Sequence, residues 1–387
     1  MIAASTPTHR RDAKLLVVGP DGKLSHIART NFPALLRPGD VVIANDAATL
    51  PASLFGSHLP TGAKIEVRLA GRESLDPHAV RYFSAVVFGG GDFHTPTEHR
   101  PNPPELRSGD ALQLGPIHAT VVRLLDHPRL VFLRFEGSTN EIWQGLARHG
   151  RPIQYAYIPT PLGLWDAWTP IAGPPVAFEP PSASFILNWN TLDSITRRKV
   201  QFGTITHAAG ISSTGDPSLD ARLPFNEPYR IPEAAVNLVQ DARTHGRRVI
   251  AVGTTVVRAL EHAAGADGEL RSGEGIATQK IRLETNLRVV DAILTGTHEP
   301  GSSHYELLRA FVNDETLDFI DRELKEHRYL THEFGDSIFV EKIASGQTAT
   351  NREVMVPVTS GNNATTGNSS SGPETFLPSH SYMPHVT

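Results

Sequence analysis

The spacing of apolar residues changes between the two halves of the chain, and this change constrains the fold more than any other feature of the sequence. Between about Lys14 and Glu136, short apolar runs alternate with turn residues, as in KIEVRLAG (64–71) and RLVFLRF (129–135), a pattern typical of β-strands. From about Pro232 the apolar residues recur at helical spacing, with short strand-like runs between them. The sequence therefore predicts a β-barrel domain joined to an open α/β sheet domain.

The expected domain boundaries follow these changes in pattern. We expect residues 1–60 to contribute to the α/β domain and the junction, 61–150 to form the barrel, 151–345 to form the α/β domain, and 346–387 to be a disordered tail rich in Ser, Thr, Asn and Gly. A crossing segment rich in Pro and Trp (145–185) begins the second domain. We expect Trp165 and Trp168 to cover the junction, with stacking on a purine or holding a cation as the alternative.

Two stretches place Gly-Asp directly before an apolar strand: LRPGDVVIAN (36–45) and LRSGDALQLG (106–115). Gly-Asp is typical of a turn. Closing a sheet into a barrel hides the strand edges that many short strands would otherwise expose. We therefore interpret the two stretches as equivalent corners of one barrel.

Charge and composition exclude several classes of function. The 387-residue chain has a formal net charge of -5 and a pI of about 6.4, so it has no overall positive field to attract nucleic acid or an anionic membrane. It has no cysteine, which excludes disulfides, thiolate nucleophiles and cysteine-based zinc sites. Its start lacks a signal-peptide pattern, and no run approaches the roughly 18 apolar residues of a membrane helix. We expect a cytoplasmic protein without membrane contact.

A helix, strand, turn and helix in succession mark the candidate ligand site. IPEAAVNLVQDARTHG (231–246) has the Pro start and Gly end of a helix, and RVIAV (248–252) reads as a strand. Gly253, Thr254 and Thr255 follow at the boundary between this strand and the next helix. Ligands of open α/β sheets bind at the carboxyl ends of strands, where a helix start offers free N–H groups. The turn therefore suits an anionic group, with simple capping of the helix by the threonines as the alternative.

Histidines provide the candidate proton-transfer groups. His207 and His298 follow apolar strand-like runs and His332 precedes EFGD, positions at strand ends and loops where a side chain can reach a pocket. A structural role for each is the alternative. HEPGSSH (298–304) lacks the His-Glu-x-x-His spacing of a zinc helix, so we predict no metal site.

Four stretches spread over about 300 residues carry a resemblance to a known family. They are LRPGDVVIANDAATLPASLFG (36–56), RVIAVGTTVVRALE (248–261), RVVDAILTGTHEPGSS (288–303) and EFGDSIFV (333–340). In this order and spacing they resemble the S-adenosylmethionine:tRNA ribosyltransferase-isomerase family of queuosine biosynthesis. The resemblance implies a β-barrel joined to an α/β domain. It also implies transfer and isomerisation of the ribosyl part of S-adenosylmethionine onto an aminomethyl-7-deazaguanine at the tRNA wobble position, releasing adenine and methionine. S-adenosylmethionine is then a consumed substrate, and no cofactor is implied.

The resemblance further implies the residues of the site. The substrate-binding set is Asn45, Ser182, Gly253, Thr254, Thr255, Arg258, Glu261 and Thr295. The C–H beside a sulfonium needs a base and the departing adenine needs a proton, so we assign His207 and His298 as catalytic candidates. Asp46 and Asp336 are the carboxylates expected to orient them or to balance the sulfonium.

The chain departs from the family pattern at positions that bear on the acceptor. The two arginines of the family's Asn-Asp-Thr-Arg-Val-Ile-Pro-Ala-Arg-Leu motif are replaced by Ala48 and Ser53, and the histidine of its Pro-Thr-Ala-Gly-Leu-His-Phe motif is missing from Pro181–Phe185. Arginine is well suited to phosphate, so this loss, with the acidic pI, weakens the tRNA interpretation. We interpret the chain as a divergent paralogue that keeps the S-adenosylmethionine half of the site.

The leading interpretation is thus a ribosyltransferase-isomerase with a tRNA nucleobase as acceptor. Two alternatives stay open: the same donor chemistry on a free small-molecule acceptor, and a non-catalytic ligand- or RNA-binding paralogue. The sequence leaves the oligomeric state and the division of acid and base roles open.

Overall fold

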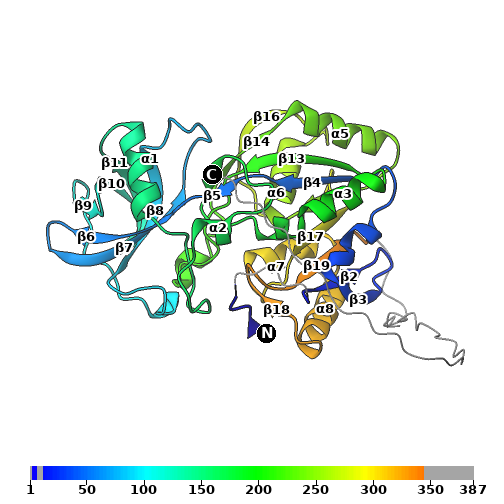
Figure 1. The fold of residues 1–387 in the computed structure, drawn as a ribbon, viewed down its shortest axis with the longest axis horizontal. Helices are drawn as coiled ribbons and strands as arrows, with labels where there is room; N and C mark the ends of the chain where they lie inside the picture. The colour runs from blue at the N-terminus through cyan, green and yellow to red at the C-terminus, as the bar shows by residue number, and fades with distance from the viewer. Residues whose placement is uncertain (1, 7–11, 344–387) are drawn as a thin grey trace, which may run out of the picture. The chain divides into compact units, whose positions relative to one another are not determined.

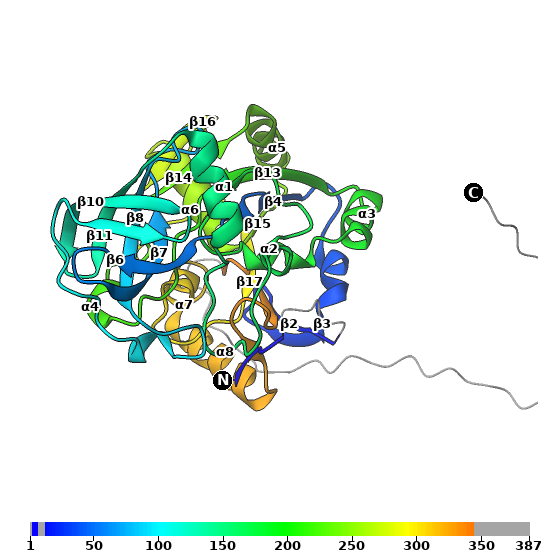
Figure 2. The same cartoon turned by 60° about the vertical axis from the view of Figure 1, so that its left-hand side comes forward.

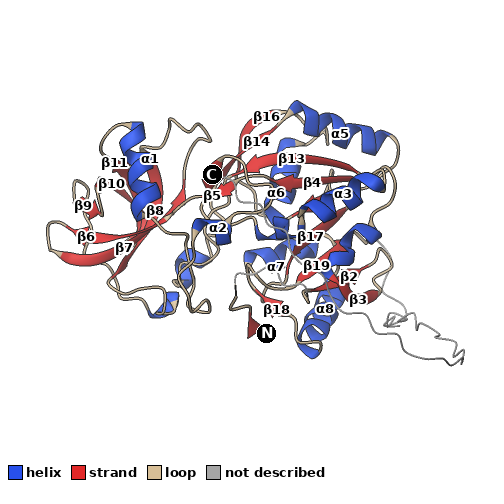
Figure 3. Cartoon of the chain, viewed as in Figure 1, coloured by secondary structure: helices blue, strands red, loops and turns tan. Residues whose placement is uncertain are grey.

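The computed structural model describes residues 2–6 and 12–343. Its main strands form a closed six-stranded barrel and a nine-stranded sheet with helices on its faces (Figures 1 and 3). The expected β-barrel and α/β sheet are confirmed. The expectation for the tail, Gly346–Thr387, lies outside the described residues. No helix within residues 2–6 and 12–343 is long and apolar enough to cross a membrane.

The barrel consists of strands that run antiparallel to their neighbours. In order around the barrel they are β10 (Ile117–His127), β11 (Leu130–Phe135), β8 (Tyr82–Gly89), β7 (Ala63–Gly71), β6 (Ser53–His58) and β9 (Ala111–Leu114). Inward side chains such as Val67, Leu69 and Leu133 form one apolar core. Helix α1 (Thr139–His149) lies beside the barrel (Figure 2), contacts β10 and adds Ile142 and Leu146 to that core.

The nine-stranded sheet supplies the frame of the second domain. Its order is β16 (Gly273–Ala277), β14 (Glu227–Ile231), β13 (Gln201–His207), β4 (Val41–Asn45), β15 (Val249–Val252), β17 (Ala292–Gly296), β19 (Ser337–Glu341), β2 (Lys14–Val18) and β3 (Leu24–Ala28). The four central strands β13, β4, β15 and β17 are mutually parallel. Their carboxyl ends therefore meet at one edge, where ligands of such sheets bind.

Helices cover both faces of this sheet (Figure 3). Val41 and Ile43 of β4 pack with α5 (Glu233–Thr244), α6 (Thr254–Ala263) and α8 (Asp314–Glu326). Val42 and Ala44 of the same strand pack on the other face, with α3 (Trp189–Arg197) and the 3-10 helix η1 (Arg29–Leu35). Because successive side chains of a strand point to opposite faces, a run that is apolar throughout needs this cover on both sides.

Shorter elements complete the chain. They are β1 (Ile2–Ala3) paired with β18 (Leu330–Thr331), β5 (Ala48–Thr49) paired with β12 (Pro175–Ala177), the helices α2 (Leu164–Ala167), α4 (Pro217–Asp220) and α7 (Ser303–Leu307), and the 3-10 turns η2 (Thr97–His99), η3 (Ser182–Ile186) and η4 (Leu308–Ala310).

The interpretation of two equivalent barrel corners is wrong. The first stretch leads into β4 at the centre of the nine-stranded sheet, and the second leads into β9 of the barrel. The two share only a local turn: Asp40 and Asp110 each accept a hydrogen bond of 2.7 Å from the backbone N–H three residues earlier. Gly39 and Gly109 both have a positive φ, of 91° and 93°, which glycine adopts at little cost. The motif thus specifies a turn and carries no information about which sheet follows.

The two tryptophans of the crossing segment have different environments. The indole N–H of Trp168 donates to the carbonyl oxygen of Thr49 in β5 (2.9 Å). Trp165 packs edge-on against Trp168, with ring centroids 5.1 Å apart, and is 81% exposed. Trp168 therefore anchors the segment, whereas Trp165 covers little.

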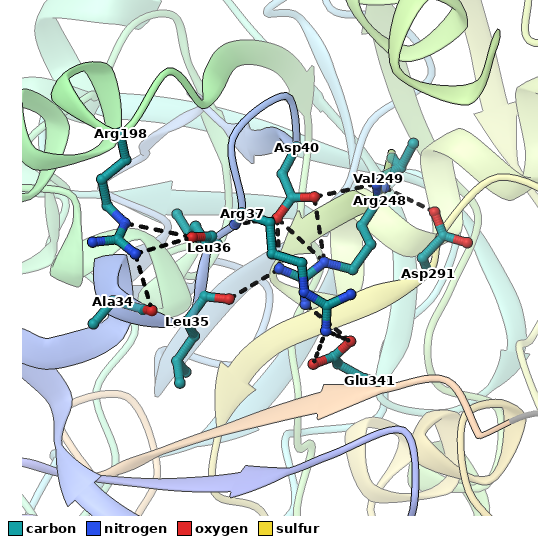
Figure 4. Close-up of polar contacts among 10 residues, drawn as sticks. All are labelled: Ala34, Leu35, Leu36, Arg37, Asp40, Arg198, Arg248, Val249, Asp291 and Glu341. Atoms are coloured by element: carbon teal, nitrogen blue, oxygen red, sulfur yellow. Dashed lines mark hydrogen bonds and ion pairs between the residues drawn. The ribbon is translucent and has the colours of Figure 1, made fainter. Parts of the chain in front are cut away.

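Charged side chains, of which Asp40 is fully buried and Asp291 is exposed, connect the amino ends of the central strands (Figure 4). Asp40, which precedes β4, accepts hydrogen bonds of 2.5 and 3.2 Å from the guanidinium of Arg248, which precedes β15. Arg248 also pairs with Glu341 of β19 (2.9 Å). Asp291, before β17, accepts a hydrogen bond from the backbone N–H of Val249 (2.8 Å). Because a buried charge is costly without its partner, these contacts hold the strand starts in register.

Asp40→Asn is therefore expected to lower the free energy of unfolding by about 3 kcal/mol, since it leaves the mostly buried Arg248 without its main counter-charge. Urea unfolding measures the change. The control is Glu105→Gln, because this carboxylate is 79% exposed in its pair with Arg107, and a loss below about 1 kcal/mol is expected there. An Asp40→Asn loss as small as that of the control would contradict the structural role.

Candidate active site

A pocket opens at the carboxyl edge of the central strands. Its wall is formed by the turn after β15, the start of α6, the end of β17, the start of α7, and the segments that follow β12 and β13. Six of the predicted substrate-binding residues, Ser182, Gly253, Thr254, Thr255, Arg258 and Thr295, line it, as does the predicted catalytic residue His298. These residues come from three separate parts of the chain, at 182, 253–258 and 295–298.

Gly253 shapes the turn between β15 and α6. Its φ is 98°, a conformation that costs a residue with a Cβ atom free energy. Its backbone N–H donates to the carbonyl oxygen of Leu294 in β17 (2.8 Å), so the turn is tied to the neighbouring strand. Gly253 is the N-cap of α6, and no described side chain makes a capping hydrogen bond there. Thr254 and Thr255 form the first turn of the helix at the pocket wall, where N–H groups and the helix dipole favour an anionic group.

A buried carboxylate, Glu227 at the start of β14, gathers three groups beneath the pocket. His207 Nε2 lies 2.9 Å from one oxygen, the Arg258 guanidinium donates to the same oxygen, and the backbone N–H of Gly210 donates to the other (2.6 Å). Burial by itself would raise the pKa of Glu227, but the Arg258 charge and the His207 contact outweigh it and lower the pKa to about 2. Glu227 is thus ionised at neutral pH and fixes both partners.

His207 is engaged at both ring nitrogens. Nδ1 lies 2.7 Å from the carbonyl oxygen of Thr255, and Nε2 faces Glu227. The side chain is completely buried and is not part of the pocket wall. The geometry suits a residue that holds the first turn of α6 in place.

Asn45, at the end of β4, connects two neighbouring elements. Its amide donates to the carbonyl oxygen of His207 (2.9 Å) and contacts the Thr255 hydroxyl (3.4 Å), and its oxygen accepts the N–H of His207 (3.0 Å). Asn45 is fully buried. It supports the threonine turn from behind.

His298 and His304 face each other at the wall of the pocket. Their rings are stacked with centroids 4.4 Å apart and an angle of 13° between planes. Burial and the neighbouring imidazoles His304 and His332 hold the pKa of His298 well below its usual value. His298 is therefore neutral at neutral pH, with a nitrogen lone pair available to accept a proton.

Three predicted site residues lie elsewhere. Asp46 accepts hydrogen bonds from two threonine hydroxyls of β13 (2.7 and 3.0 Å), and Asp336 accepts two backbone N–H groups (both 2.8 Å). Glu261 accepts three successive backbone N–H groups at 288–290 (2.8 to 2.9 Å). None of these carboxylates lines the pocket. The hydrogen bonds of these three carboxylates connect neighbouring strands and loops.

Sequence reasoning missed Glu179, Glu227 and His304, which all line the pocket. Glu227 and His304 have no sequence motif that separates them from other charged residues near strands. Glu179 had an available signal, because it lies two residues before Pro181–Phe185, which corresponds to the family's Pro-Thr-Ala-Gly-Leu-His-Phe motif.

Among the described residues, His26, Glu323 and His327 form the group with geometry closest to a metal site. His26 already contacts the Tyr329 hydroxyl with one nitrogen (3.0 Å) and Glu323 with the other (3.1 Å), and the Lys14 ammonium lies 4.6 Å from the Tyr329 ring centroid. The three residues are separate from the pocket wall. We assign no metal to them.

A family model and two relatives support the sequence resemblance. A family model described as "Queuosine biosynthesis protein" matches residues 1–340. The S-adenosylmethionine:tRNA ribosyltransferase-isomerase of Gloeobacter violaceus is 30% identical over 344 residues, which cover 87% of this chain and 92% of that protein. The protein of the same name from Sorangium cellulosum is 29% identical over 371 residues, covering 89% and 96%. A crystal structure of S-adenosylmethionine tRNA ribosyltransferase from Thermotoga maritima matches with a TM-score of 0.46 and 21% identity, covering 87% of this chain and 96% of that one.

The buried Glu227 predicts a specific acid sensitivity. Its pKa falls from 4.5 to about 2 on folding, so its stabilising effect is fully present above about pH 4.5 and is lost as the pH falls toward about 2. The difference corresponds to a contribution on the order of 3 kcal/mol. Urea unfolding at a series of pH values between these limits should show a smaller loss of stability for Glu227→Gln than for the wild type. Equal slopes for the two proteins would refute the assignment.

Proposed function

This chain belongs to the queuosine biosynthesis protein family, and we propose that it is an S-adenosylmethionine:tRNA ribosyltransferase-isomerase. It transfers the ribosyl part of S-adenosylmethionine to an aminomethyl-7-deazaguanine and isomerises it, with release of adenine and methionine. The observation that supports this most directly is the strand-end pocket, because the Gly253–Thr255 turn that the sequence shares with the family lines it.

The pocket suits a sulfonium nucleoside with a carboxylate at one end. The first turn of α6 presents N–H groups and the Thr254 and Thr255 hydroxyls to an anionic group. Glu227 on the same wall is ionised, and its charge is paired with the Arg258 guanidinium. The Arg258 guanidinium also donates to three carbonyl oxygens, so it is held in place as a support for Glu227.

Proton transfers require a base and an acid. The sulfonium makes the neighbouring C–H acidic, and His298 is a neutral imidazole at the pocket wall, so we assign it as the base. His207 has no ring nitrogen facing the pocket, so we assign it a positioning role through Thr255 and Glu227.

The residues at the two family arginine positions, Ala48 and Ser53, support weaker tRNA binding than the family pattern implies. Ala48 is buried in β5, and the buried Ser53 donates its hydroxyl to Glu66 (2.7 Å). Glu66 is paired with the buried Arg68 and Arg100. The two positions that carry arginine in the family therefore offer no cation to a phosphate. This makes a free aminomethyl-7-deazaguanine the second candidate acceptor.

Adenine release tests the reaction. Incubation with S-adenosylmethionine and tRNA bearing the aminomethyl base should release adenine and methionine in equal amounts. His298→Ala is expected to lower the rate about 10²- to 10⁴-fold, as removal of a general base does. His118→Ala, an exposed residue of barrel strand β10, is the control and should keep the wild-type rate. No adenine from the wild type with either acceptor would leave the non-catalytic paralogue as the function.

Salt dependence distinguishes the acceptors. Binding of tRNA should weaken by about tenfold or more between roughly 50 and 200 mM salt, because phosphate contacts release counterions. Binding of the free aminomethyl-7-deazaguanine should change little, because this base carries no phosphate. Gel shift for tRNA and calorimetry for the base measure the two. Turnover with the free base and no detectable tRNA binding at the lower salt concentration would overturn tRNA as the acceptor.

A further inference from the structure

A second carboxyl group, Glu179, lines the same pocket in a very different environment. It lies between β12 and η3 and is 7% exposed. The hydroxyl of Tyr155 donates to it, and Ser212 contacts both residues. Among the described residues, none forms an ion pair with Glu179, in contrast to the guanidinium that neutralises Glu227.

The titratable groups near Glu179 come from a barrel strand and from loops of both domains. Tyr155 stacks on Tyr157, with ring centroids 5.9 Å apart, and the Tyr157 hydroxyl donates to Glu333. The charge of Glu333 reaches Glu179, and so does that of Arg68, whose guanidinium lies 5.6 Å from the Tyr155 ring centroid. Arg68 is itself paired with Glu66 (2.7 Å), which limits the positive charge available to Glu179.

These surroundings favour the protonated acid. Burial and the charge of Glu333 raise the pKa of Glu179 to about 7, against hydrogen bonds from Tyr155 and Ser212 that lower it. Glu227 in the same pocket has a pKa of about 2. When two carboxyl groups in one pocket have very different pKa values, one commonly acts as an acid while the other stays ionised. His298, held neutral, completes the set as a base.

We propose that Glu179 is the general acid of this pocket and donates the proton that the departing adenine requires. The bond between the ribosyl carbon and the adenine nitrogen breaks, and its electron pair stays on adenine. The proton of the Glu179 carboxyl adds to adenine, so that neutral adenine leaves and Glu179 becomes a carboxylate. The acceptor amine loses a proton when its nitrogen bonds to the ribosyl carbon, and this proton restores the Glu179 acid. The inference rests on the proposed ribosyl transfer.

The pH profile of adenine release tests this role. The wild-type rate should fall as the pH rises above about 7, because Glu179 then loses its proton. Glu179→Gln should lower the rate about 10²- to 10⁴-fold and should lack this basic limb. The matched control is Glu105→Gln, an exposed carboxyl of the first domain, which should keep both the rate and the limb. A Glu179→Gln enzyme with the wild-type rate and limb would overturn the proposal.

Two neighbours should move the basic limb in opposite directions. Glu333→Gln removes a charge that raises the pKa of Glu179, so the limb should shift to lower pH. Tyr155→Phe removes a hydrogen bond that lowers the pKa of Glu179, so the limb should shift to higher pH. A merely structural role of Glu179 would not produce opposite shifts, so an unchanged limb in both variants overturns the proposal even where Glu179→Gln folds poorly.

A direct titration separates this inference from the proposed function. Carbon-13 NMR of glutamate-labelled full-length protein, with Glu179→Gln used to assign the signal, should show this carboxyl titrating near pH 7 without any substrate. If the wild type releases adenine but the signal titrates near the ordinary glutamate value, only the inference fails. If the wild type releases no adenine from S-adenosylmethionine, the proposed function fails with it, whatever the titration shows.

Discussion

The buried ion pair of Glu227 and Arg258 is the contact on which the candidate site depends. One carboxylate at the start of β14 holds the guanidinium of α6, the imidazole of His207 at the end of β13 and the N–H of Gly210 in the loop that follows. Through His207 the network reaches Thr255, and through Asn45 it reaches the end of β4. A charge so deeply buried is tolerated only when fully paired, so the strand ends and the first turn of α6 must keep one arrangement.

Because of this arrangement, groups on the pocket wall are available to bind a ligand and to take part in catalysis. The threonine turn is supported from behind by buried side chains, so no side chain needs to cap α6. Glu179 and His298 lie on other parts of the same wall, and within residues 2–6 and 12–343 neither forms an ion pair. In the proposed ribosyl transfer this wall supplies Glu179 as the acid and the neutral imidazole of His298 as the base.

The departures from the family pattern have a structural consequence. Ser53 occupies a position where the family has arginine, and its hydroxyl joins the buried Glu66, Arg68 and Arg100 cluster. A charged side chain at residue 53 would have to share a carboxylate that two guanidinium groups already use. The barrel interior therefore accommodates serine in place of arginine, and neither Ala48 nor Ser53 supplies a cation that could bind phosphate.

Much of this protein was determined by the sequence alone. The change in apolar spacing predicted the barrel and the α/β sheet, and the Gly253–Thr255 motif predicted a turn at a strand end, because strand, turn and helix formation depend on neighbouring residues. The sequence also identified the family. It could not distinguish the two Gly-Asp turns, because the same local hydrogen bonds precede strands of different sheets. Only the tertiary structure showed that Asp46, Asp336 and Glu261 bind backbone and hydroxyl groups while Glu179, Glu227 and His304 face the pocket. Burial and the partners of a carboxyl group decide its role, and both depend on residues distant in the chain that only the folded structure brings together.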